Sequence, residues 1–207
     1  MKSYITVLNK SEYRFEDRKS VFIGYACPVA CENDALSYIN EIKKKHPTAR
    51  HWVYAYVLKE NSIARFSDDR EPQGTAGMPV LDAIRKNGCV DVLIVVVRYF
   101  GGVLLGTGGL VHAYSESAIG ALKSARIVTY NRYADVIIEV SYPDYQKLNP
   151  LFSRFDVCVN ETDFTDTVKI TGNVLSDMFS ELENKITEVT SGRGKITFVK
   201  EQFGFRE

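Results

Sequence analysis

The sequence predicts an α+β fold built from two domains, and three features of the chain point to it. Segments with helical and strand periodicity are interleaved along the first part of the chain, as expected for helices packed on a sheet. The last part carries a complete strand and helix pattern of its own. Charge is also divided: residues 1–133 contain 18 Lys or Arg and 13 Asp or Glu, whereas residues 134–207 contain 8 and 13. We therefore expect one domain over 1–133 and a second over 134–207.

In the first domain, each element follows from its apolar spacing. We expect strands over 4–7, 21–27, 51–58, 63–67 and 91–98, and helices over 35–45, 79–87 and 109–125. The polar turn Glu60-Asn61-Ser62 predicts that the third and fourth of these strands form a hairpin. Residues 127–133 form either a last strand or a connector. The interleaved order predicts two layers, with the helices packed on one face of the sheet.

For the second domain the sequence predicts the order strand, helix, strand, strand, helix, strand. The expected strands are 136–141, 157–162, 167–172 and 195–200, and the expected helices are 144–155 and 175–189. This order is that of the ferredoxin-like split βαβ unit. The domain has a charge balance of −5 and no RNA-binding aromatic signature on its strands, so it is the weaker candidate for contact with phosphate.

The segment most informative about function follows the apolar run 92–97, which suits a strand buried on both faces. A basic residue, two aromatic residues and a series of glycines lead from this run into the helix expected from residue 109. Because helix N-termini attract anions, we expect an exposed, electropositive pocket that accepts phosphate or carboxylate. Alternatively, the glycines serve only tight turns and close packing. The candidate anion-binding residues are Lys19, Arg98, Tyr99, Phe100, Gly101, Gly102, Gly106, Gly108 and Gly109.

These glycines match neither common nucleotide-binding template. A P-loop requires Lys and then Ser or Thr after its last glycine, and neither follows Gly106 or Gly109. A dinucleotide fingerprint requires a small residue where Val111 stands.

A second polar segment, residues 68–79, places three carboxylates within four residues. Such carboxylates repel one another unless an arginine (Arg70 or Arg98 here), water or a metal ion compensates. One interpretation is a general acid/base pair or a magnesium site. The other is a solvated turn that caps its own backbone. The candidate polar cluster is His51, Asp68, Asp69, Glu71, Gly74, Thr75 and His112.

Composition narrows the class of protein. The four cysteines show no metal-ligand spacing and the three histidines are scattered, so we assign no metal ligands and no cofactor. No apolar stretch approaches the length of a membrane span, and the N-terminus lacks a signal-peptide core. We expect a cytoplasmic protein with no membrane partner, and we leave its oligomeric state open.

Several of these segments together resemble the YigZ/IMPACT family, an uncharacterised protein family whose N-terminal part is called the Impact domain. The matching segments are Lys19-Ser20-Val21-Phe22-Ile23, Arg50-His51, Ala55-Tyr56, Phe66-Ser67-Asp68-Asp69, Glu71-Pro72, Gly74-Thr75-Ala76-Gly77, Arg98-Tyr99-Phe100-Gly101-Gly102, Leu105-Gly106 and Gly108-Gly109-Leu110-Val111. Two positions depart from the family pattern: Arg70 stands where glycine is usual, and His112 replaces a common arginine.

The resemblance implies an N-terminal domain with the fold of ribosomal protein S5 domain 2, similar to domain IV of elongation factor G. It implies a C-terminal domain similar to the ferredoxin-like C-terminal domain of that factor. Eukaryotic members act in translational control by competing for the activator of a starvation-sensing kinase. They use an N-terminal RWD domain that we do not expect in this chain, so that partner is not transferred.

Three hypotheses about function remain open. In the first, the N-terminal domain binds RNA phosphates with Lys19, Arg98 and the glycine amides, while Tyr99 or Phe100 stacks on a base. This first hypothesis predicts salt-sensitive binding of RNA or the ribosome. In the second, the carboxylates of the polar cluster position a metal ion or water in a hydrolase, and the glycine loop holds an anionic substrate. In the third, the same surface docks an acidic translation-associated protein. We favour the binding protein over the enzyme and assign no catalytic residue.

Overall fold

The computed structural model describes residues 3–206 of the chain. The chain divides into two compact units, residues 4–129 and a unit containing residues 130–206, and each is described by itself. The predicted α+β fold class with two domains is confirmed. The boundary expected after residue 133 falls inside β7, a continuous strand over Ile127–Val140.

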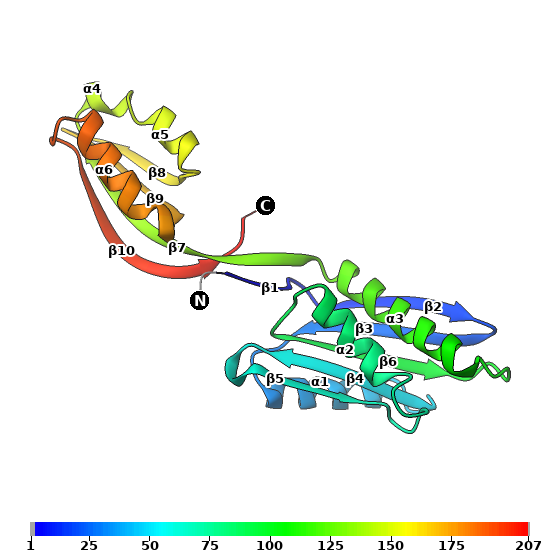
Figure 1. Ribbon diagram of the computed structural model, residues 1–207. Helices are drawn as coiled ribbons and strands as arrows, with labels where there is room; N and C mark the ends of the chain where they lie inside the picture. Colours follow the sequence, from blue (N-terminus) through cyan, green and yellow to red (C-terminus); the bar gives the residue numbers. More distant parts are fainter. Residues whose placement is uncertain (1–2, 207) are drawn as a thin grey trace. The chain divides into compact units, whose positions relative to one another are not determined.

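The N-terminal domain contains a five-stranded antiparallel sheet in the order β2-β3-β6-β4-β5 (Figure 1). Its strands are β2 (Ser11–Asp17), β3 (Ser20–Pro28), β4 (His51–Leu58), β5 (Ile63–Ser67) and β6 (Val92–Tyr99). The predicted hairpin is the pair β4 and β5, joined by the short 3₁₀ turn η1 (Glu60–Ser62). Strand β2 was not predicted; it is an edge strand in which exposed and half-buried residues alternate.

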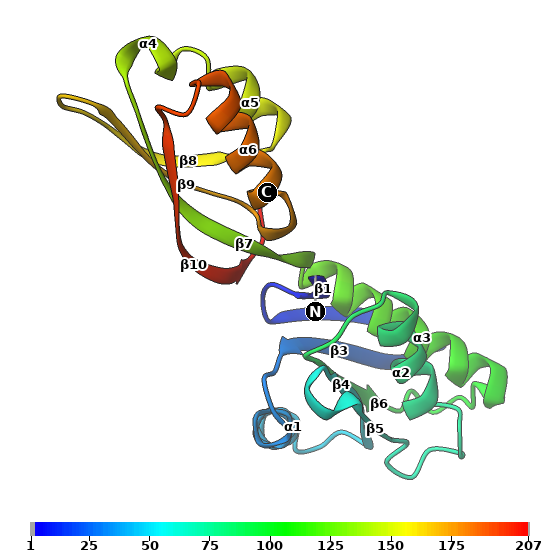
Figure 2. The same ribbon diagram turned by 60° about the vertical axis from the view of Figure 1, so that its left-hand side comes forward.

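Helices cover both faces of this sheet. Helix α1 (Glu32–Lys45) lies on one face, whereas α2 (Gly77–Lys86) and α3 (Gly106–Ser124) lie on the other (Figures 1 and 2). Strand β6 contributes side chains to the hydrophobic cores on both faces of the sheet. Val92, Ile94 and Val96 pack with α2 and α3, and the alternate residues pack with α1. The predicted packing of all helices on one face of the sheet is therefore wrong. A central strand that is apolar on both faces requires cover on both, which α1 provides.

The C-terminal domain has the split βαβ arrangement. Its strands are β7, β8 (Cys158–Phe164), β9 (Val168–Leu175) and β10 (Lys195–Gly204). Strand β1 (Ser3–Val7) belongs from Tyr4 onward to the N-terminal unit, and its Val7 lies in the core under α2 and α3. The spatial order β10-β7-β9-β8, antiparallel throughout, is that of the ferredoxin-like unit. Alternate residues of β7 and β9 pack under α5 (Asn149–Arg154) and α6 (Phe179–Val189). The short 3₁₀ turn η2 (Ser176–Met178) precedes α6.

The helix expected over 144–155 is divided into α4 (Tyr142–Tyr145) and α5. Pro150 lies in the first turn of α5, where its missing N–H leaves no hydrogen bond unmade. A continuous helix would require that N–H, so the proline sets the start of a new helix.

Close packing of α3 on β3 gives a first prediction. A Cβ atom added at Gly24 would lie 2.4 Å from the carbonyl oxygen of Ser117, so Gly24→Ala should destabilise the domain by roughly 1–3 kcal/mol. Urea unfolding followed by the fluorescence of Trp52, the only tryptophan, measures this. Gly108→Ala is the control, because a Cβ there meets nothing within 4 Å. Equal stability of both variants would contradict the packing described.

The buried carboxylate of Asp144 gives a second prediction, which concerns pH. Hydrogen bonds from Lys147, at 2.6 Å, and from Arg193 hold the pKa of Asp144 well below its ordinary value. Because the folded pKa is the lower one, the stabilisation is complete above the unfolded value of about 3.9 and is lost as pH falls further. Asp144→Asn should lower the free energy of unfolding at pH 7. It should also make the fall of that free energy below pH 4 less steep than in the wild type. Urea unfolding followed by far-UV circular dichroism tests it, and parallel pH profiles for the variant and wild type would contradict it.

Candidate functional site

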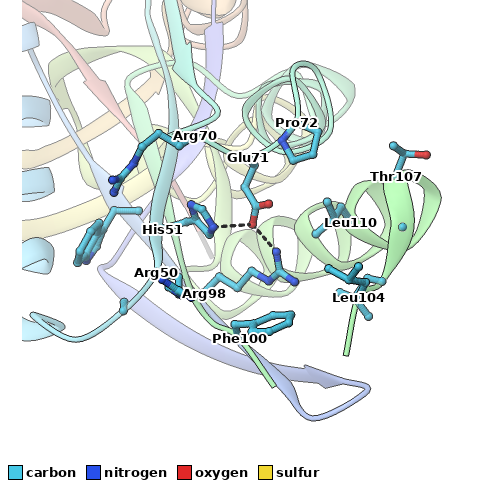
Figure 3. Close-up of a pocket in the computed structure, with 14 residues that line it drawn as sticks. Arg50, His51, Arg70, Glu71, Pro72, Arg98, Phe100, Leu104, Thr107 and Leu110 are labelled. Carbon is cyan, nitrogen blue, oxygen red and sulfur yellow. Dashed lines mark hydrogen bonds and ion pairs between the residues drawn. The ribbon is translucent and has the colours of Figure 1, made fainter. Parts of the chain in front are cut away.

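A cavity of about 660 Å³ opens in the N-terminal domain, beside the start of β4 and the end of β6 (Figure 3). The turn before α2 and the N-terminus of α3 complete its wall. Its volume is within the usual range for a small-molecule or cofactor site. The lining residues are Ala49, Arg50, His51, Trp52, Arg70, Glu71, Pro72, Arg98, Phe100, Leu104, Leu105, Gly106, Thr107 and Leu110.

The floor of the cavity is a buried ion pair between Arg98 and Glu71. Arg98 Nη1 donates to Glu71 Oε1 at 2.6 Å, and the two residues are 5% and 8% exposed. Strand geometry explains the burial, since Arg98 pairs with Phe22 of β3 and shares with it the face covered by α2 and α3. A buried guanidinium requires a carboxylate partner. Arg98 is therefore already neutralised. It is not the exposed, anion-binding cation expected beside the glycines, and it is one of the two arginines that the sequence offered as a partner for the carboxylates.

Two further groups converge on the same carboxylate oxygen. The Tyr114 hydroxyl, from α3, donates to Glu71 Oε1 at 2.8 Å. Burial, and then the negative charge of Glu71, raise the pKa of Tyr114 well above its ordinary value, so this hydroxyl keeps its proton. His51 Nδ1 lies 2.8 Å from the carbonyl oxygen of Asp69, to which only a protonated nitrogen can donate. Its Nε2 then faces Glu71 Oε1 at 3.6 Å.

The three carboxylates of the polar segment have different roles. Asp68 accepts hydrogen bonds from the backbone N–H groups of Gly74, Ala76 and Gly77 and so caps the start of α2. Asp69 accepts from the backbone N–H of Trp52 at 2.7 Å. Only Glu71 of the three lines the cavity. The self-capping turn that the sequence left as an alternative describes Asp68 well, and the polar cluster does not act as one carboxylate group.

The strand–loop residues around Arg98 are divided between the two faces of the sheet. Tyr99 pairs with Val21, and its hydroxyl lies 2.9 Å from His46 Nδ1 on the α1 side, away from the cavity. Phe100 lines the cavity, is 42% exposed and has its ring centroid 5.6 Å from the Arg98 guanidinium. Alternation along a strand therefore separates two aromatic neighbours that the sequence had grouped.

The predicted glycines serve several purposes. The amide of Gly101 donates to Ser20 Oγ, and a Cβ there would lie 2.1 Å from the backbone carbon of Lys19. Gly106 has a φ of 73°, begins α3 and lines the cavity. Gly102, at a φ of 82°, and Gly108 would leave a Cβ in open space. Gly109 packs against Leu105. Turn formation and close packing thus account for part of the series, and Gly106 is the member that the cavity includes.

The remaining predicted residues lie outside the lining. Lys19 is exposed in the β2–β3 turn with a φ of 65°. His112 is exposed on α3 with its ring at the edge of Phe15. Gly74 belongs to the turn that Asp68 caps, and the Thr75 hydroxyl donates to the carbonyl of Pro72 at 2.6 Å. None of these four residues lines the cavity.

Sequence reasoning missed Trp52, Leu104 and Tyr114 as site residues and did not assign Arg50 and Arg70 to the site. Arg50 and Arg70 are exposed at the cavity wall, and Arg70 has a φ of 70°, a backbone region that favours glycine. Tyr114 carried only the signal of a core position on a helix. Spacing along the chain gives no indication that its hydroxyl meets Glu71, because 43 residues separate them.

Within residues 3–206 no three His, Cys, Asp or Glu side chains are grouped as metal ligands would be. Over the same residues, no helix has both the length and the apolar character needed to cross a membrane.

Fold and site together define a class: a two-domain α+β protein with an arginine-rimmed cavity in its N-terminal domain. Comparison with known proteins agrees, since residues 18–122 match the Impact N-terminal domain and residues 138–193 match a domain of unknown function (DUF1949). The chain belongs to the IMPACT family.

Relatives support this assignment along most of the chain. IMPACT family member YvyE of Bacillus subtilis is 33% identical over 195 residues, which cover 94% of this chain and 90% of YvyE. IMPACT family member YigZ of Escherichia coli is 29% identical over 90% of this chain and 93% of YigZ. Protein IMPACT of Xenopus laevis is 33% identical over 100 residues, only 46% of this chain and 32% of that protein.

A solved structure also resembles the chain. It is described as the crystal structure of a hypothetical protein, is 27% identical, and superposes with a TM-score of 0.61 over 97% of this chain and 98% of that one. The likeness covers both domains.

The Arg98–Glu71 pair gives a third prediction. Arg98→Met leaves a buried, uncompensated carboxylate and should cost about 3–5 kcal/mol. The double variant Arg98→Met/Glu71→Leu removes both charges and should recover most of that stability. Urea unfolding monitored by Trp52 fluorescence measures both. A double variant no more stable than Arg98→Met would show that the two charges are not coupled.

Proposed function

We propose that this protein binds single-stranded RNA at the cavity of its N-terminal domain and acts through it in translation regulation. The observation that carries the proposal is the pair of exposed guanidinium groups at the edge of a cavity that also presents an exposed aromatic ring. Single-stranded RNA is recognised by this combination, in which cations hold phosphates and aromatic rings stack on unpaired bases.

The charge of the lining favours an anionic ligand. Arg50, Arg70 and Arg98 stand against one carboxylate, that of Glu71. Because Arg98 and Glu71 neutralise each other, the positive charge available to a ligand comes from the other two arginines. In the described part of the chain, neither the Arg50 nor the Arg70 side chain makes a hydrogen bond or ion pair. Binding of phosphate therefore disrupts no existing interaction.

The N-terminus of α3 adds a partial positive charge on another side. Leu105 at its N-cap position provides no side-chain hydrogen bond, in contrast to α2, which Asp68 caps. In Figure 3, Arg70 lies on one side of the Glu71–Arg98 pair and Thr107, in the first turn of α3, lies on the other. A nucleotide chain passing across the cavity would meet the Arg70 guanidinium at one edge and the partial positive charge of the α3 N-terminus at the other.

The family supports translation as the process. The resemblance of both domains to parts of elongation factor G, and the role of eukaryotic members in translational control, both favour an RNA of the translation machinery. Fold likeness alone is a weak argument for function, so the proposal depends on the cavity.

The alternative of a metal-assisted hydrolase has less support. It requires Asp68, Asp69 and Glu71 to share one cleft, whereas Asp68 and Asp69 are used by backbone N–H groups and only Glu71 lines the cavity.

The proposal predicts the effect of removing both rim charges. Arg50→Ala/Arg70→Ala should weaken binding of a labelled single-stranded oligoribonucleotide pool by about tenfold or more. For the variant, the slope of log affinity against log salt concentration should become less steep by about 0.7 for each phosphate that it no longer neutralises. Fluorescence anisotropy over a salt series measures both quantities.

The matched control is Lys43→Ala/Lys44→Ala, which removes two exposed cations from the end of α1 and leaves the cavity unchanged. Unchanged affinity in the arginine variant, or an equal reduction in both variants, would reject the rim as the RNA site. Ribosome co-sedimentation that survives nuclease treatment would point to a protein partner instead.

A further inference from the structure

The floor of the cavity has hydrogen-bonding groups that the protein itself does not satisfy. Glu71 Oε1 receives Arg98 and Tyr114, but residues 3–206 offer no hydrogen bond to its second oxygen, Oε2. Figure 3 shows that oxygen turned away from His51 and Arg98. An ionised carboxylate only accepts hydrogen bonds, so a ligand that reaches Oε2 must present an N–H or O–H group.

The guanidinium of Arg98 keeps donor capacity beside that carboxylate. Its Nη1 donates to Glu71 Oε1, and within the described residues its Nε is buried without a hydrogen-bond partner. Trp52 Nε1 is also buried without a partner, but Trp52 packs with the core on the α1 face of the sheet, opposite to the face of the Arg98–Glu71 pair. Buried donors without acceptors are rare in folded proteins, and each requires an explanation. A ligand that carries an acceptor beside its donor groups would meet the guanidinium of Arg98 while it donates to Glu71.

The ion pair fixes the spacing of donor and acceptor. Because Arg98 Nη1 and Glu71 Oε1 are 2.6 Å apart, the guanidinium and the carboxylate form one rigid edge with donors on one side and an acceptor on the other. A planar ligand with the complementary edge carries an acceptor next to an N–H donor. The Watson–Crick edge of a nucleobase has this arrangement.

Among the four bases, guanine fits this edge best. Its O6 accepts hydrogen bonds, as in the common pairing with arginine, and its adjacent N1–H and N2–H₂ groups both donate. The two neighbouring donors can approach the single open oxygen of Glu71, which has two lone pairs. Adenine and cytosine each carry one donor group beside ring acceptors, and uracil carries one donor between two acceptors. Each of these bases therefore gives the carboxylate fewer hydrogen bonds or faces it with an acceptor.

The walls suit a flat ring. Leu105 and Leu110 are buried at the cavity wall, and Phe100 and Leu104 stand exposed at it, with Leu104 81% exposed. Apolar side chains of this kind cover the faces of a base while polar groups read its edge.

We infer that the cavity receives an unpaired guanine, with Glu71 accepting from its N1–H and N2–H₂ groups and the Arg98 side donating to O6. The inference rests on the proposed RNA binding and names the base that the site reads. Arg50 and Arg70 then hold the phosphates of the same nucleotide or its neighbours.

The test varies the ligand, so that it does not depend on the folding of a variant. Isothermal titration calorimetry compares 5′-GMP with IMP, which lacks the N2 amino group, with 1-methyl-GMP, which lacks N1–H, and with AMP. GMP should bind about tenfold more tightly than IMP and at least about tenfold more tightly than 1-methyl-GMP and AMP, because each of these lacks a hydrogen bond to a charged group. Equal affinities for the four nucleotides would overturn the inference.

A protein variant gives the second arm. Glu71→Gln keeps the size of the side chain and should reduce the preference for GMP over AMP about tenfold or more, with circular dichroism confirming the fold. If this variant does not fold, Phe100→Ala, at an exposed position, should weaken all four nucleotides without changing their order. A GMP preference that survives in folded Glu71→Gln contradicts the role of the carboxylate.

Oligonucleotides separate this inference from the proposed function. Guanine-containing single strands should bind more tightly than guanine-free strands of equal length. If the wild type binds guanine-containing and guanine-free strands equally, the recognition of guanine is overturned and the proposed RNA binding stands. Selective binding of GMP without binding of any oligonucleotide would reject RNA as the ligand and retain the nucleotide site.

Discussion

The buried ion pair between Arg98 and Glu71 is the constraint on which the site depends. It joins the end of the central strand to the turn before α2, and Tyr114 attaches α3 to the same carboxylate oxygen. Breaking such a pair leaves a charge in a poorly solvated place, which costs several kcal/mol. The three segments around the cavity are therefore held by one electrostatic interaction, and the cavity keeps a fixed arrangement of donors and acceptors.

The same interaction changes how the positive charge of the domain is used. The sequence shows an arginine at the end of a buried strand next to glycines, which suggests a free anion-binding group. In the structure that arginine is an internal partner, and the charge open to a ligand lies on Arg50 and Arg70. The cavity thus has a rigid, neutral pair of hydrogen-bonding side chains at its floor and two cationic arginines at its rim. This division suits a ligand with a flat polar base and a charged backbone.

Much of the fold could be predicted because it follows from local patterns. The apolar run of β6 predicted a strand buried on both faces, and the polar turn after β4 predicted its hairpin with β5. What could not be predicted depends on interactions between distant residues. The sequence offered Arg98 as one of two arginines that could compensate the carboxylates, and a self-capping turn as one interpretation of their segment. It could not decide between the alternatives, because the contacts of Glu71 with Arg98 and of Asp68 with Gly77 join residues 27 and 9 positions apart. Tyr99 was grouped with the site because it is adjacent to Arg98, although strand alternation sends it to the other face.

The most direct measurement of the central claim is nitrogen-15 NMR of the Arg98 side chain, assigned by comparison with Arg98→Lys. The account predicts a separate, slowly exchanging Nε–H resonance, because that group is buried, and a shift of this resonance when 5′-GMP is added. An Arg98 signal that exchanges as fast as those of exposed arginines and does not respond to GMP would contradict it.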